Sequence, residues 1–126
     1  MAAKYSLKIV TDFAAAHLLR DYPGVCNQLH GHNFKVEVEV TSTRLDPVGM
    51  GVDFKVLKEA TRAELSILDH RHLNEIPPFD IINPTAENIA AYLFQRLGMR
   101  LNGETHRITA ITLWETERAC VRYTED

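Results

Sequence analysis

The chain has 126 residues, of which 45% are hydrophobic and 25% are charged, and its formal net charge is −3. This length suits one domain with its own core, expected over residues 1–126, and the slight acidity argues against nucleic-acid or anionic-membrane partners. The N-terminus lacks the apolar stretch of a secretory signal, and no apolar run is long enough to span a membrane. Its two cysteines, Cys26 and Cys120, are too few for a disulfide framework, so we expect a reduced, cytoplasmic protein.

Two segments in the first third of the chain have the alternation of half-buried strands. Residues 5–13 alternate between apolar and polar side chains, and residues 33–43 do so more clearly. In the second segment, a phenylalanine and three valines face one way while lysine, glutamate and threonine face the other. Both segments are therefore predicted to be strands with one buried face.

Two helices are predicted to follow. Asp53 is a suitable N-cap for a helix over residues 54–67, and Thr85 for a second helix that ends near Gly98. Helical spacing predicts that the first helix buries Val56, Ala60, Ala63 and Ile67.

Residues 106–116 and 119–124 are predicted to form two strands joined by a tight turn. The resulting order is ββααββ, which is typical of an α+β fold with a largely antiparallel sheet. Counted by simple alternation, the first of these strands has apolar residues on both faces: Ile108, Ala110 and Trp114 on one, Ile111 and Leu113 on the other. This pattern predicts burial on both sides, by helices and by a partner subunit.

The segment from Cys26 to His32 contains one thiol and two imidazoles, and His17 lies a short way upstream. Neutral imidazole is a common zinc ligand, and three protein ligands with one open position are typical of a catalytic zinc site. His30 and His32 point to the same side of an extended backbone. If the two N-terminal strands are neighbours, parity brings all three imidazoles to one face, and the pattern favours zinc, although copper, iron and nickel also accept imidazole. The alternative is that the histidines are unrelated polar residues at strand ends.

Four further residues, which make three candidate sites, have two interpretations for each site. Cys26 is either a fourth ligand, which would close the site as a structural one, or a free thiol whose thiolate is a base. Asp69 and His70 are either an ordinary pair at a helix end or an acid/base dyad in which the carboxylate orients the imidazole. Glu115 either faces water at a strand end or accepts hydrogen bonds from a ligand with adjacent N–H donors.

Six motifs occur in this order: Phe13-Ala-Ala-Ala-His17, Cys26-x-x-x-His30-Gly31-His32-Asn33-Phe34, Gly49-Met50-Gly51-Val52-Asp53-Phe54, Leu68-Asp69-His70-x-x-Leu73-Asn74, Pro84-Thr85-Ala86-Glu87-Asn88 and Trp114-Glu115-Thr116. Together they resemble the 6-pyruvoyltetrahydropterin synthase family. The resemblance implies the tunnelling fold, in which two helices cover one face of an antiparallel sheet, subunits form a trimeric barrel and two trimers stack into a homohexamer.

The resemblance also implies roles for the candidate residues. Zinc would lie on His17, His30 and His32, with Cys26 free as a base. Asp69 and His70 would relay protons, and Glu115 would anchor a pterin ring.

The three residues between Cys26 and His30 resemble the 6-carboxytetrahydropterin synthase branch, the enzyme of queuosine biosynthesis. That enzyme converts 7,8-dihydroneopterin triphosphate to 6-carboxy-5,6,7,8-tetrahydropterin and releases acetaldehyde and triphosphate. The alternatives are the pyruvoyl-forming synthase, which eliminates triphosphate without carbon–carbon cleavage, and a non-enzymatic zinc protein with Cys26 as fourth ligand.

Overall fold

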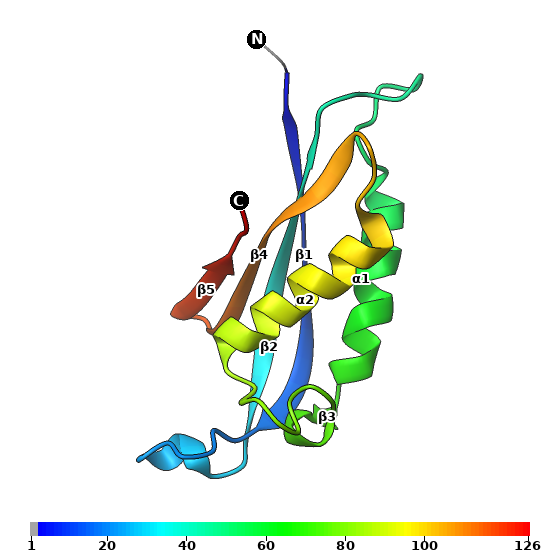
Figure 1. The fold of residues 1–126 in the computed structure, drawn as a ribbon. Helices are drawn as coiled ribbons and strands as arrows, with labels where there is room; N and C mark the ends of the chain where they lie inside the picture. Colours follow the sequence, from blue (N-terminus) through cyan, green and yellow to red (C-terminus); the bar gives the residue numbers. More distant parts are fainter. Residues whose placement is uncertain (1–2) are drawn as a thin grey trace.

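The computed structural model describes residues 3–126, so Met1 and Ala2 of the predicted domain lie outside the described residues. A five-stranded sheet in the order β3-β1-β2-β4-β5 carries two helices on one face (Figure 1). The elements are β1 (Tyr5–His17), η1 (Val25–Asn27), β2 (His30–Ser42), α1 (Phe54–Leu68), β3 (Arg71–His72), η2 (Leu73–Glu75), α2 (Ala86–Leu101), β4 (His106–Thr116) and β5 (Ala119–Tyr123). The predicted α+β fold with both helices on one face is confirmed. The short strand β3, which pairs in parallel with β1, was not predicted.

The strands β1 and β2 form the longest antiparallel pair in the sheet. Their register runs from Tyr5 opposite Ser42 to His17 opposite His30, so both strands reach further than the alternation predicted. Phe13 and Phe34 stack at this end of the pair with ring centroids 4.9 Å apart. The buried face of the sheet thus extends to the histidines.

A β-bulge in β4 corrects the prediction of a strand with two apolar faces. The register shifts between Glu39 and Val40, which places Ile108 opposite Val40 and Ile111 opposite Val38. The extra residue in β4 reverses the alternation at that point. Ile108, Ile111 and Leu113 therefore share the helix-covered face, and each is at most 1% exposed. These three residues need no partner subunit to bury them, whereas Trp114, opposite Lys35, is only half-buried on the other face.

Both predicted N-caps are present: the side chain of Asp53 accepts from the backbone N–H of Lys55, and Thr85 from that of Asn88. The predicted end of the second helix is wrong, since α2 passes through Gly98 and ends at Leu101. The predicted buried stripe of α1 is also wrong. The buried residues are Leu57, Thr61, Glu64, Leu65 and Leu68.

The two helices are joined by a buried carboxylate. Glu64 of α1 is fully buried and accepts hydrogen bonds from Arg96 and Arg100 of α2.

Within residues 3–126, neither helix combines the length and apolar composition that a membrane span needs.

Candidate metal centre

Three histidines meet at the end of the sheet where β1 finishes and β2 begins, at the bottom of Figure 1. His17 lies opposite His30 in the register, and His32 lies two residues further along β2. One ring nitrogen from each imidazole lies within 4.8 Å of the other two, and the ring centroids of His17 and His30 are 4.6 Å apart. The convergence predicted from parity is confirmed, and the cluster could hold a metal ion.

Backbone carbonyls set the orientation of two of these rings. Nδ1 of His17 is 2.7 Å from the carbonyl oxygen of Pro84, and Nδ1 of His30 is 2.8 Å from that of Gln28. A carbonyl can only accept, so Nδ1 carries the hydrogen in both rings and Nε2 keeps its lone pair. Such hydrogen bonds fix the tautomer and orientation of metal-binding histidines.

The electrostatics of the cluster suit a cation. Nε2 of His17 and Nε2 of His32 are buried without a hydrogen-bond partner among the described residues. Burial is the main cause that lowers the pKa of His17, and likewise the pKa of His32. Both imidazoles are therefore held in the neutral form, the form that binds metal. A metal ion would satisfy the orphaned nitrogens, so the residues present fit a metal.

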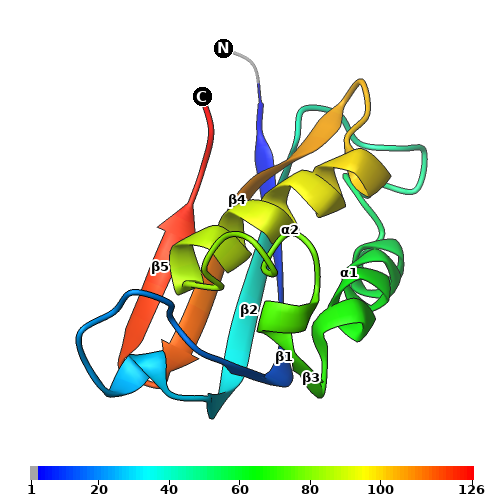
Figure 2. The ribbon, with the colours of Figure 1, turned by 60° about the horizontal axis from the view of Figure 1, so that its bottom comes forward.

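Cys26 lies in η1, within the loop that joins β1 to β2 (Figure 2). Its side chain is half-buried, and its sulfur is not among the atoms that converge with the three imidazoles. The carbonyl oxygen of Cys26 accepts a hydrogen bond of 2.7 Å from the backbone N–H of Leu19. In this arrangement Cys26 is a free thiol and not a fourth ligand, and its role as a base stays a prediction.

The side chains of Asp69 and His70 lie in contact, and both residues are hydrogen-bonded to β1. Oδ1 of Asp69 lies 2.9 Å from Nδ1 of His70 and accepts from the backbone N–H of Ala14, also at 2.9 Å. The N–H of His70 donates to the carbonyl of Ala14 over 2.6 Å. The backbone of His70 has φ 59°, a left-handed conformation that is uncommon for a residue other than glycine. The structure thus places the two side chains in contact, and their role as an acid/base dyad stays a prediction.

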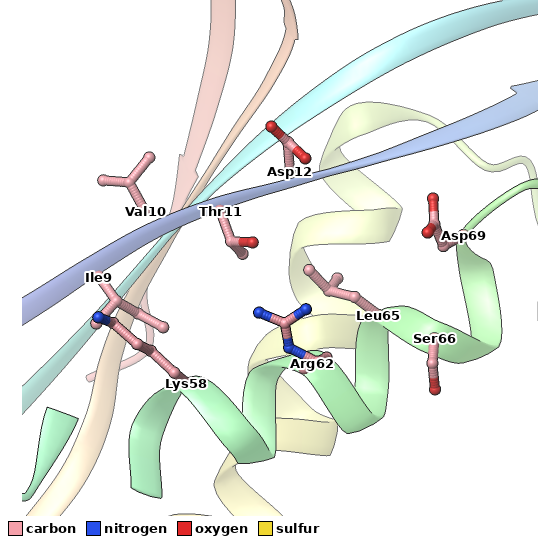
Figure 3. Close-up of a pocket in the computed structure, with 9 residues that line it drawn as sticks. All are labelled: Ile9, Val10, Thr11, Asp12, Lys58, Arg62, Leu65, Ser66 and Asp69. Carbon is pink, nitrogen blue, oxygen red and sulfur yellow. The ribbon is translucent and has the colours of Figure 1, made fainter. Parts of the chain in front are cut away.

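Figure 3 shows Asp69 at the end of a cleft between β1 and α1, with its carboxylate turned toward β1. The cleft also carries Lys58 and Arg62 of α1 together with Asp12 of β1. Two cations and two carboxylates give it no net charge, and none of the three histidines lines it. The candidate metal centre therefore lies outside this cleft.

Two surface depressions meet at His32. One, of about 500 Å³, is lined by His32, His70 and the small residues that surround them on β1 and β2. The other, of about 620 Å³, is lined by His32, Trp114 and Glu115. Oε1 of Glu115 is 3.5 Å from Nε2 of His32, and the Glu115 side chain is 32% exposed. Glu115 therefore lies beside the cluster, and its role as an anchor for a ligand stays a prediction.

Residues 6–126 match the protein family described as 6-pyruvoyl tetrahydropterin synthase. The solved 6-pyruvoyl tetrahydropterin synthase of Caenorhabditis elegans superposes with a TM-score of 0.86 at 28% identity, covering 98% of this chain and 97% of that one. A Synechocystis sp. protein named 6-carboxy-5,6,7,8-tetrahydropterin synthase is 41% identical over 90 residues, which are 68% of each chain. A Pyrococcus furiosus protein named dihydroneopterin monophosphate aldolase is 36% identical over 103 residues, 82% of each chain. This chain, with its sheet, its two helices and its cluster of three histidines, belongs to the 6-pyruvoyl tetrahydropterin synthase family.

Proposed function

We propose that this protein is a zinc-dependent lyase that converts 7,8-dihydroneopterin triphosphate to 6-carboxy-5,6,7,8-tetrahydropterin, with release of acetaldehyde and triphosphate. Family membership and the name of the Synechocystis relative support the reaction. The observation that carries the proposal is the cluster of three imidazoles, in which His17 and His32 have buried, unpartnered Nε2 atoms. The spacing between Cys26 and His30 favours the carboxy-forming branch.

Each side chain has a chemical task in this proposal. His17, His30 and His32 would hold the zinc ion, which supplies Lewis-acid chemistry at the hydroxyls of the substrate side chain. The thiolate of Cys26 removes the proton from the carbon next to the pterin ring. His70 moves protons at the hydroxyl end.

Asp69 keeps the ring of His70 in position through the 2.9 Å contact with Nδ1. Glu115 accepts hydrogen bonds from the ring N–H and the exocyclic amino group of the pterin, two parallel donors that match the two oxygens of one carboxylate. His32 borders both the depression that holds His70 and the depression that holds Glu115. This placement supports a substrate that lies across the metal, with its ring on the Glu115 side.

The proposal includes assembly into a homohexamer of two trimers. Among the described residues, the edge of β1 that faces away from β2 is paired only at Ala15 and Ala16, with β3. At the other end of the sheet, β5 is the outermost strand. Closing a barrel from several subunits would pair both edges. The His70 side chain is 81% exposed, so it is available to a site shared with a neighbouring subunit. A cytoplasmic location and a place in queuosine biosynthesis belong to the same proposal.

Incubation of the zinc-loaded protein with 7,8-dihydroneopterin triphosphate, followed by product identification, tests the reaction. We expect acetaldehyde, triphosphate and 6-carboxy-5,6,7,8-tetrahydropterin, and no product with Cys26→Ala. A pyruvoyl product without acetaldehyde would assign the chain to the pyruvoyl-forming branch instead. Consumption of dihydroneopterin monophosphate alone would assign it to the activity named for the Pyrococcus relative. Zinc binding without any turnover would leave the non-enzymatic alternative.

A further inference from the structure

The segment Leu18–Arg20, which directly follows His17, is held by two asparagine side chains from a distant part of the chain. Asn74 accepts from the backbone N–H of Leu18 at 2.9 Å and donates to its carbonyl at 3.0 Å. Asn83 makes the same pair of hydrogen bonds to Arg20, at 2.9 Å in both directions. A carboxamide has one acceptor and two donors, so one side chain satisfies both backbone groups of one residue, as a neighbouring strand would.

The opposite side of the same segment holds Cys26. In an extended backbone, the polar groups of alternate residues point to the same side. Leu18 and Arg20 face the asparagines, whereas the N–H of Leu19 donates to the carbonyl of Cys26 at 2.7 Å. The segment therefore lies between the two asparagines and the turn that carries the thiol.

The asparagines are themselves fixed to the parts of the chain that carry the other site residues. Asn74 lies in η2, shortly after Asp69 and His70. Asn83 precedes Pro84, whose carbonyl orients His17, and the carbonyl of Asn83 accepts from the Asn88 side chain of α2 at 2.9 Å. The same region of the chain also binds Arg20, because the guanidinium of Arg20 donates to the carbonyl of Phe79 at 2.7 Å.

We propose that Asn74 and Asn83 are positioning residues that set the place of the Cys26 thiol relative to the imidazole of His17. Neither asparagine is among the atoms that converge at the metal centre. The effect of the two asparagines on turnover rests on the function proposed above. Their effect on the position of the thiol is independent of that function, because it follows from the hydrogen bonds alone.

Alkylation of the thiols tests the proposal without substrate. Asn74→Ala and Asn83→Ala each remove two hydrogen bonds and should let the Cys26 turn open more often. We expect iodoacetamide to alkylate Cys26 about tenfold faster in both variants, as measured by peptide mass spectrometry. The exposed Cys120 on β5 is the internal reference, and its rate should not change. Asn102→Ala is the matched control, since Asn102 also accepts from a backbone N–H, that of Ile108 at 2.7 Å, away from the site.

Turnover gives the second readout. A positioning role predicts that kcat falls by about tenfold in both alanine variants while KM stays within about twofold. Asn74→Asp keeps the acceptor for Leu18 but turns a carboxylate oxygen toward the Leu18 carbonyl, so its alkylation rate and kcat should change at least as much as those of Asn74→Ala. The aspartate variant also provides the test if the alanine variant does not fold.

Rates of Cys26 alkylation and kcat values equal to those of Asn102→Ala would overturn the proposal. If the wild-type protein has no turnover, the proposed function fails, and the alkylation rates alone decide the role of the asparagines.

Discussion

At the scale of single residues, His70 combines a strained backbone with a side-chain contact to Asp69. Its φ of 59° is a conformation that glycine adopts freely, and its ring is bound to Asp69. We predict that His70→Gly leaves the free energy of unfolding unchanged or raises it by up to about 1 kcal/mol. Turnover should fall by about 100-fold or more. Urea denaturation and steady-state kinetics on one preparation measure both. An active His70→Gly protein would refute the relay role of His70.

Replacement of Cys26 by alanine and replacement of His30 by alanine should have different effects on zinc content. Cys26→Ala should keep one zinc per subunit, because the sulfur does not converge with the imidazoles. The same variant should lose turnover, because the proposed base is missing. His30→Ala should lose most of the zinc, because two ligands remain. Metal analysis and turnover of the two variants in parallel provide the check. Loss of zinc from Cys26→Ala would make Cys26 a ligand.

The residues of the cluster could be predicted from the sequence, but their orientation could not. Parity along β1 and β2 was enough to place His17, His30 and His32 on one face. The rings are oriented by the carbonyl oxygens of Pro84 and Gln28. Every residue has a carbonyl, so no residue type signals this role. The sequence indicates the proposed positioning role of Asn74 and Asn83 only weakly, because asparagine is common in loops for many reasons.

At the scale of elements, the sequence predicted the order of strands and helices but not the faces of two of them. In β4 the extra residue between Ile108 and Ala110 brings Ile108 to the same face as Ile111 and Leu113, whereas Trp114, opposite Lys35, stays on the other face. The stripe of α1 was placed one residue away from the observed one. Glu64 lies in the buried face, whereas a glutamate is ordinarily expected to face water.

The buried Glu64 makes the stability of the fold depend on pH. Burial opposes its ionisation, but hydrogen bonds and charge from Arg96 and Arg100 more than offset burial and lower its pKa. A carboxyl with a depressed pKa stabilises the fold above its unfolded pKa of about 4.3, and this contribution is lost as the pH falls through the folded value. Glu64→Gln should therefore lower the free energy of unfolding by about 1–3 kcal/mol at pH 7.

The difference between wild type and Glu64→Gln should shrink below about pH 4, and denaturant titrations across the pH range measure it. The matched control is Glu59→Gln on the exposed side of α1, which should change stability by less than about 0.5 kcal/mol. A pH-independent difference would show that the charge of Glu64 is not what joins the helices.

At the scale of the whole molecule, the sheet has two open edges, along β1 and along β5. Open edges with unpaired N–H and C=O groups favour pairing with another chain. We predict that light scattering after size exclusion gives the mass of six 14.3 kDa subunits. A fully active monomer would contradict the proposed assembly.

X-ray absorption at the zinc edge of the assembled, zinc-loaded protein identifies the ligands of the metal centre. We expect one zinc per subunit with three nitrogen ligands from His17, His30 and His32, one oxygen from solvent, and no sulfur. Nitrogen and oxygen neighbours at about 2.0–2.2 Å would support the catalytic site. A sulfur neighbour at about 2.3 Å would instead show that Cys26 closes the site as a structural one.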